Sequence, residues 1–166
     1  MENHACGIRR HVFHGHDNFF PYKDHSDTIL LMTKLYINLP VADLPKATAF
    51  YEAIGFTLNP QFSSGEASGM VWDDSLSVML LTHGFCANFL GKKTIADAHA
   101  TTEVLNALQF DSKAEVDAFF EKAIRAGGKK TIDAYDHGFM YGRDFEDPDG
   151  HIWEAFWMDA SQMPKE

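Results

Sequence analysis

An internal repeat is the feature that most constrains how this chain can fold. Phe50 and Tyr51 lie on an apolar helical face, and Phe119 and Phe120 lie on a second such face 69 residues later. At the same offset, Tyr36 in a segment of alternating polarity maps onto Leu105. The offset is that of two units related by internal pseudo-symmetry, and the second can pack on the first or on another subunit. The repeat therefore predicts two equivalent modules.

Each copy has the pattern of a strand, a helix and three further strands. In the first, Asp43 is an N-cap and Gly55 a stop signal for the helix, and in the second Ser112 with Glu115 forms a capping box. The predicted strands span residues 35–41, 56–59, 67–72 and 76–82, then 104–110, 129–133, 139–145 and 152–157. The predicted fold class is thus α+β, with two β-α-β-β-β modules.

The predicted domain boundaries follow from composition and pattern. Residues 1–31 hold five of the nine histidines and show no sustained period, which predicts an N-terminal extension outside the fold. A single domain is expected over 32–160, with module one at 33–87, a polar, alanine-rich linker at 88–102 and module two at 103–159. Residues 160–166 are expected to form a C-terminal tail.

Charge and composition exclude several classes of partner. The net charge of −10 leaves no large positive field, so nucleic acid binding is not expected. No apolar run approaches the roughly 20 residues that span a bilayer, so no membrane partner is expected. Cys6 and Cys86 form no CxxC motif, which favours a reducing cytoplasm. The 14 phenylalanines indicate an aromatic interior or a pocket for a small molecule.

Two segments carry a resemblance to a known family. LPVADLPKATAFYEAIGF, residues 39–56, resembles the opening strand and helix of glyoxalase-type proteins, and FEDPDGHIWEAFW, residues 145–157, resembles their closing hairpin. With the repeat, the resemblance to the vicinal oxygen chelate superfamily of glyoxalases, bleomycin-resistance proteins and extradiol dioxygenases covers nearly all of residues 32–159. It implies a curved mixed sheet or open barrel, a cleft between modules that holds a divalent ion, and a homodimer.

The family's metal site is depleted in this sequence. Its four ligand positions fall on Tyr36, Leu80, Leu105 and Glu154, of which only Glu154 is a plausible ligand. One carboxylate does not hold a divalent ion against water. We therefore expect no cofactor. The alternative is a zinc, nickel or magnesium ion held by Glu154 with His83.

Glu154 is the expected catalytic residue or polar anchor. Strand alternation puts Glu154 on one face with Phe156 and puts Trp153 and Trp157 on the other, against a helix. The alternative is a structural pairing with Arg143 or Lys129. Further ligand-binding residues are expected among polar and aromatic side chains of the strands, each with ordinary core packing as its alternative. These are Tyr36, Asn38, Gln109, Phe139, Tyr141 and Arg143.

Three functions are compatible with the resemblance. The missing ligands favour a bleomycin-resistance-like protein that binds a small organic molecule without metal. The alternative is a metal-dependent lyase or isomerase similar to lactoylglutathione lyase, so whether the chain is an enzyme stays open. A ring-cleaving dioxygenase needs two histidines and a carboxylate, and only the carboxylate is found.

Overall fold

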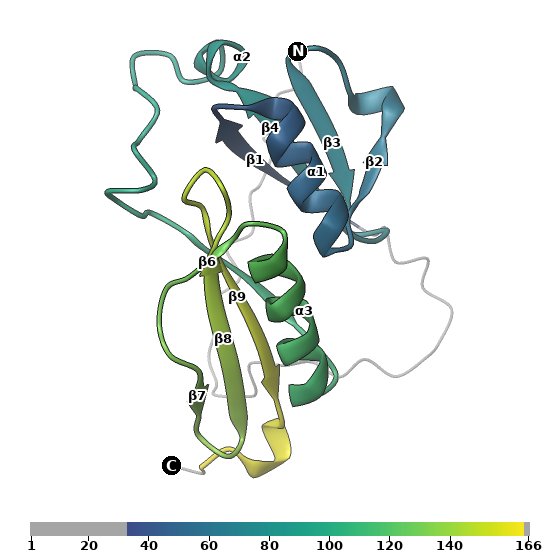
Figure 1. Ribbon diagram of the computed structural model, residues 1–166, viewed down its shortest axis with the longest axis vertical. Coiled ribbons are helices and arrows are strands. Elements are labelled where there is room, and N and C mark those ends of the chain that lie inside the picture. The colour runs from purple at the N-terminus through teal and green to yellow at the C-terminus, as the bar shows by residue number, and fades with distance from the viewer. Residues whose placement is uncertain (1–32, 165–166) are drawn as a thin grey trace, which may run out of the picture. The chain divides into compact units, whose positions relative to one another are not determined.

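The computed structural model describes residues 33–164, and the N-terminal extension predicted at 1–31 lies outside these residues. The chain divides into two units, residues 1–31 and 32–166. The second unit is α+β and holds two separate mixed sheets, each with its own long helix (Figure 1). The predicted fold class is confirmed. The two modules form no closed barrel within residues 33–164.

The first module forms a sheet of order β1-β4-β3-β2. Its elements are β1 (Leu35–Val41), α1 (Leu44–Ile54), β2 (Thr57–Asn59), the 3-10 helix η1 (Pro60–Phe62), β3 (Ala67–Val71) and β4 (Leu76–Thr82). Asp43 caps α1 by accepting the Lys46 amide at 3.0 Å, and Gly55 ends it at φ 119°, a conformation that favours glycine. β1 runs parallel to β4 and the other pairs are antiparallel.

The second module repeats this topology in a sheet of order β5-β9-β8-β6, with β7 also beside β8. Its elements are β5 (Leu105–Gln109), α3 (Lys113–Arg125), β6 (Lys129–Lys130), β7 (Tyr135–Asp136), β8 (Met140–Glu146), β9 (Ile152–Met158) and the 3-10 helix η2 (Ala160–Gln162). β5 runs parallel to β9, as β1 does to β4. The repeat in the sequence is therefore a repeat in the fold.

Two details differ from the sequence prediction. The strand predicted at 129–133 is replaced by two short ones, β6 and β7, with the exposed Lys130–Asp133 ion pair between them. A short helix, α2 (His83–Ala87), follows β4 and was not predicted. Its N-cap is Thr82, whose hydroxyl accepts the Phe85 amide at 3.3 Å.

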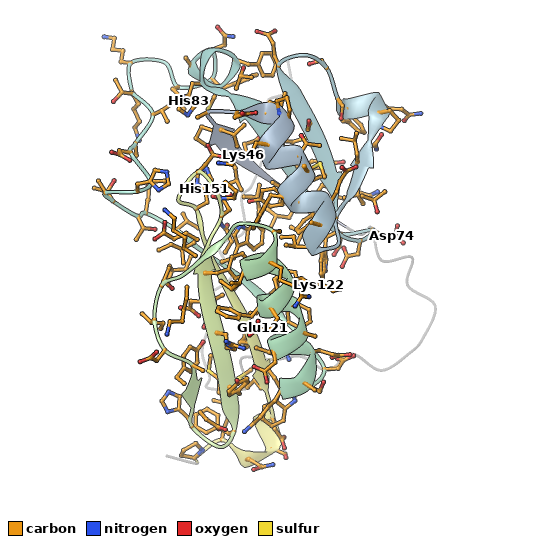
Figure 2. The ribbon with its side chains drawn as sticks, viewed as in Figure 1. Lys46, Asp74, His83, Glu121, Lys122 and His151 are labelled. Atoms are coloured by element: carbon orange, nitrogen blue, oxygen red, sulfur yellow. The ribbon has the colours of Figure 1, made fainter. Side chains whose placement is uncertain are left out.

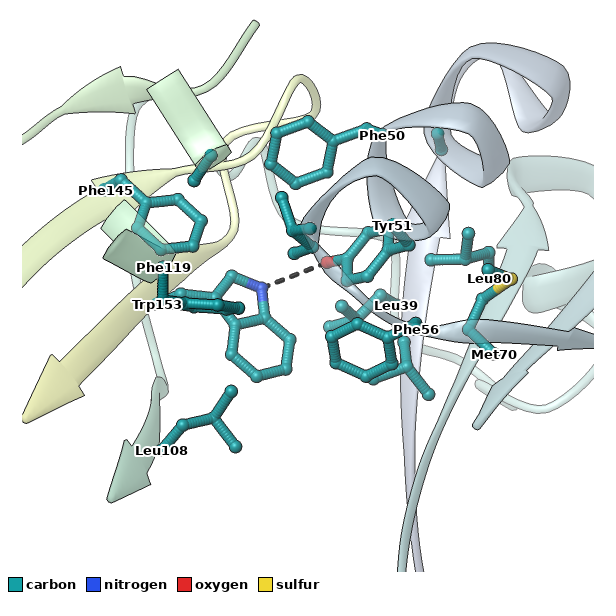
Figure 3. Packing of buried hydrophobic residues seen from close by; sticks show 14 of the residues in the cluster. Leu39, Phe50, Tyr51, Phe56, Met70, Leu80, Leu108, Phe119, Phe145 and Trp153 are labelled. Carbon is teal, nitrogen blue, oxygen red and sulfur yellow. Dashed lines mark hydrogen bonds between the residues drawn. The ribbon is translucent and has the colours of Figure 1, made fainter. Parts of the chain in front are cut away.

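The core lies between each sheet and its helix and continues from one module to the other. Phe50, Tyr51, Phe119, Phe145 and Trp153 belong to one buried cluster (Figure 3). As predicted, Trp153 lies on the helix side of β9, where its Nε1 donates to the Tyr51 hydroxyl at 3.0 Å.

A polar network crosses the contact between the modules. The Tyr51 hydroxyl donates in turn to Asp147 Oδ2 at 2.8 Å, and Asp147 Oδ1 accepts the amides of Asp149 and His151, each at 2.9 Å. Burial raises the pKa of Asp147. Tyr51 and Asp147 are 0% and 1% exposed, so this bonding compensates for polar groups removed from water.

Candidate functional site

Each sheet has one face against its long helix and an opposite face, which we call its open face. On the first sheet the short helix α2 covers part of the open face, where Cys86 packs with Leu81 and Ala67. On the second sheet, β5 residue Ala107, β9 residue Glu154 and β8 residue Asp144 lie directly opposite one another. Trp153 and Phe145 on the same strands are buried in the core, so alternation places Glu154 and Asp144 on the open face. Two carboxylates are therefore direct cross-strand neighbours.

Tyr135 on β7 reaches over this face. Its hydroxyl donates a hydrogen bond to Glu154 Oε1. Its strand partner is Gly142, and a Cβ at that position would overlap the Tyr135 hydroxyl. Burial and the bond to Glu154 raise the pKa of Tyr135, so the hydroxyl stays protonated and donating.

Of the two carboxylates, Asp144 has fewer hydrogen-bond partners than Glu154. Burial, and then the charge of Glu154, raise its pKa to about 6. Among the described residues, only Asp144 Oδ1 and Thr131 Oγ1 are buried side-chain polar atoms without a hydrogen-bond partner. Thr131 is next to Asp144 across the strands, since its amide donates to the Asp144 carbonyl at 3.2 Å. This face therefore has unused capacity for hydrogen bonds.

Tyr141 and Arg143 are placed differently from the prediction. Both lie on the helix side of β8, opposite the face that carries Glu154. The Tyr141 hydroxyl donates to Asp117 at 2.7 Å, and Arg143 contacts Asp117 and Glu121 on α3, each at 3.1 Å. They fix α3 to the sheet and do not share a face with Glu154. The predicted alternative of an Arg143–Glu154 pair is likewise not formed.

The remaining predicted residues of module two lie nearer to Glu154. Gln109 is opposite Phe156 in the sheet, on the same open face as Glu154, and is exposed. Phe139 immediately precedes β8, and its ring lies 6.4 Å from that of His137, which is 5.7 Å from the Tyr135 ring. Tyr135 itself was missed by the sequence prediction, because the strand predicted at 129–133 ended before it.

On the first sheet, Tyr36 and Asn38 lie on the open face of β1 and are exposed. The Tyr36 ring packs edge to face with Phe62 at 6.4 Å. Both line a groove of about 190 Å³ with Met79 and Gly69. A Cβ at Gly69 would come within 2.8 Å of the Phe62 Cβ, so the glycine lets that aromatic residue approach the sheet. Lys34, Asp73 and Asp74 also line the groove, so its walls combine aromatic, apolar and charged groups.

Leu80 is not on this open face. It is 0% exposed within the core, and Met79 takes the position on the open face of β4. Leu105, the third of the four ligand positions, is 55% exposed at the start of β5. Neither methionine nor leucine is a ligand for a hard divalent cation.

Comparison with known proteins decides the family. The model of the glyoxalase/bleomycin resistance protein/dioxygenase superfamily matches residues 34–155. The chain belongs to this superfamily. Within residues 33–164, no helix of this glyoxalase-superfamily chain has the length and apolar character to cross a membrane.

Solved structures of the superfamily share its fold. A hypothetical protein from S. aureus is 26% identical with a TM-score of 0.64, covering 76% of this chain and 94% of its own. A family enzyme from Burkholderia phytofirmans is 20% identical with a TM-score of 0.63, covering 75% and 97%. A fosfomycin resistance protein from Mesorhizobium loti is 14% identical with a TM-score of 0.57, covering 80% and 98%. No curated protein matches the sequence.

The residues present do not fit the divalent ion that the family implies. Within residues 33–164, no three His, Cys, Asp or Glu side chains come together in a group that could hold a metal ion. Tyr135 takes up one oxygen of Glu154, and the neighbouring Asp144 supplies only a second carboxylate. We derive no chemical step through a metal.

His83, the predicted second ligand, belongs to another part of the chain. It lines a cavity of about 300 Å³ between the linker and the modules, together with His99 and His151. Figure 2 shows His83 at the start of α2 and His151 at the turn before β9. His151 Nε2 lies 2.8 Å from the Pro40 carbonyl, so it links the two modules. Glu154 is not among the residues that line this cavity.

Proposed function

We propose that this superfamily member binds a small organic molecule on its open faces without a metal ion. The observation that carries the proposal is the set of side chains on these faces: Tyr36 and Met79 in the groove of the first sheet, with Asn38 opposite Met79, and the adjacent carboxylates Asp144 and Glu154 on the second. Aromatic and apolar walls with a few polar groups are typical of organic ligand sites. Glu154 is the polar anchor of this site.

A second copy of the chain would complete the site. The helices α1 and α3 of the two modules contact each other, and only α2 packs on an open face, over part of the first sheet. Apolar side chains remain exposed there, with Leu105 in β5 at 55% and Phe62 in η1 at 53%. We propose that a homodimer covers them, since exposed apolar patches commonly mark interfaces. Sedimentation of the chain and of Leu105→Glu tests this: the variant should be monomeric.

The metal-free proposal is tested by metal analysis of the purified protein and by a hemithioacetal isomerisation assay with added nickel or zinc. We expect substoichiometric metal and no isomerisation. A panel of aromatic organic molecules should then give binding in the micromolar range that Glu154→Gln weakens. Tightly bound stoichiometric metal together with isomerase activity would establish the alternative, a lactoylglutathione lyase-like enzyme. The reducing cytoplasm proposed for the protein is tested by cell fractionation.

A further inference from the structure

The open face of the second sheet also indicates which organic molecules it selects, and this inference rests on the proposed function. We propose that the Tyr135 hydroxyl occupies the place that a ligand's hydrogen-bond donor would take on Glu154. A ligand must displace it, so the face selects organic cations such as amines and amidines.

The Tyr135 hydroxyl is an internal partner of Glu154 that a ligand can replace. It reaches Glu154 from β7, a strand of two residues paired with Gly142 and Tyr141 of β8. Gly138 at φ 82° lies in the turn between β7 and β8. A ligand that uses Glu154 must supply a donor in place of this hydroxyl.

Two acceptors then become available to one donor group. Glu154 is released by Tyr135, and Asp144 directly opposite still has a buried oxygen without a partner. An amine or amidine with several N–H groups satisfies both carboxylates, whereas an alcohol satisfies only one. A carboxylate ligand satisfies neither and is repelled by both.

The positive side chains of module two are already engaged or lie elsewhere. Lys113 pairs with Asp136 at 2.6 Å, Lys130 with Asp133 at 2.7 Å, and Arg143 pairs with α3 on the other side of the sheet. Lys129 lies on the same open face, at the sheet edge opposite Glu146, and in the described residues no ion pair joins it to Asp144 or Glu154. A ligand cation therefore meets two carboxylates that form no ion pair. The adjacent His137 and Phe139 rings offer an apolar wall.

The test compares three molecules of similar shape: benzamidine, benzyl alcohol and benzoate. Their affinities for the full chain are measured at pH 7.5 by NMR titration of ¹⁵N-labelled protein. We expect benzamidine to bind at least about tenfold more tightly than benzyl alcohol, and benzoate not to bind. The largest chemical-shift changes should be at Tyr135, Asp144 and Glu154. If benzyl alcohol or benzoate binds this face as tightly as benzamidine, the inference fails and the proposed function stands. If none of the three binds either open face, both fail.

Variants separate a specificity role from a structural one. Tyr135→Phe removes the competing hydroxyl and should raise benzamidine affinity several-fold while leaving benzyl alcohol affinity within twofold. Tyr141→Phe is the matched control, because its hydroxyl also bonds a carboxylate but on the helix side of the same sheet. It should change neither affinity. Asp144→Asn should weaken benzamidine about tenfold. Equal changes for both molecules in Tyr135→Phe, or no loss in Asp144→Asn with the fold intact by circular dichroism, would overturn the inference.

Discussion

Two tyrosine–carboxylate pairs in this molecule have the same chemistry and opposite surroundings. Tyr51 and Asp147 lie fully buried between the modules, and the oxygens of Asp147 accept three hydrogen bonds. Tyr135 and Glu154 lie on an open face, beside Asp144 with its unpartnered oxygen. A satisfied network of this kind contributes to stability, and an unsatisfied one is available to a ligand. Both pairs have the same residue chemistry. What distinguishes a structural pair from one available to a ligand here is its burial and whether its hydrogen-bonding groups all have partners.

The largest expected effect is at Asp147. Asp147→Ala should lower the free energy of unfolding by about 3 kcal/mol, because buried donors lose their acceptor. Glu154→Ala should cost less than about 1 kcal/mol, since its partner on the open face regains water. Urea denaturation of both variants checks the difference. Equal losses would contradict the division into a structural and a functional pair.

A glycine beside each pair gives the next comparison. Gly150→Ala should destabilise by about 2 kcal/mol, because φ is 94° and the new Cβ would come within 2.8 Å of the Ala98 and His99 backbone. Gly138→Ala has a similar φ of 82° but nothing within 4 Å, so only the conformational cost of about 1 kcal/mol should remain. Thermal unfolding of the two variants should show this order, and the reverse order would refute tight packing of the linker on Gly150.

Removing the hydroxyl groups tests the pairs more finely. Tyr51→Phe should cost about 1 to 2 kcal/mol, since both Trp153 Nε1 and Asp147 lose a buried partner. Tyr135→Phe should change stability by less than about 0.5 kcal/mol. Chemical denaturation at pH 7.5 distinguishes them. A large loss in Tyr135→Phe would show that this hydroxyl, too, is structural.

The smallest expected effect is a pH dependence at Asp144. Its pKa is raised from 3.8 to about 6, so its contribution to stability is fully present below pH 3.8 and is lost as the pH rises through 6. Asp144→Asn should therefore be more stable than the parent at pH 7.5, by less than about 1 kcal/mol because the side chain is only partly buried and solvent screens its charge. This advantage should vanish near pH 4. Denaturation midpoints measured from pH 4 to 7.5 would show it, and a constant difference would exclude it.

The fold was predictable from local signals, because the repeat, the caps at Asp43 and Ser112 and the alternation in β9 all act within a few residues. Leu80 was misplaced because β4 is apolar on both faces, so alternation gave no register there.

The candidate site was only partly predictable. Side chains alternate between the two faces along β8. Because Phe145 is buried against the helix, Arg143 and Tyr141 lie on the helix side as well, and this pattern could have been used to place them. Tyr135 gave no such signal, since its bond to Glu154 spans 19 residues and depends on how a loop crosses the sheet.

The parallel pairing of β1 with β4 and of β5 with β9 has a consequence for synthesis on the ribosome. The opening strand of each module stays at the edge without its neighbour until the closing strand has been translated. The first module can therefore finish its sheet while the second is still being made. The Tyr51 hydroxyl gains its partners Asp147 and Trp153 only after 96 and 102 further residues have been translated, and only then are the two halves joined.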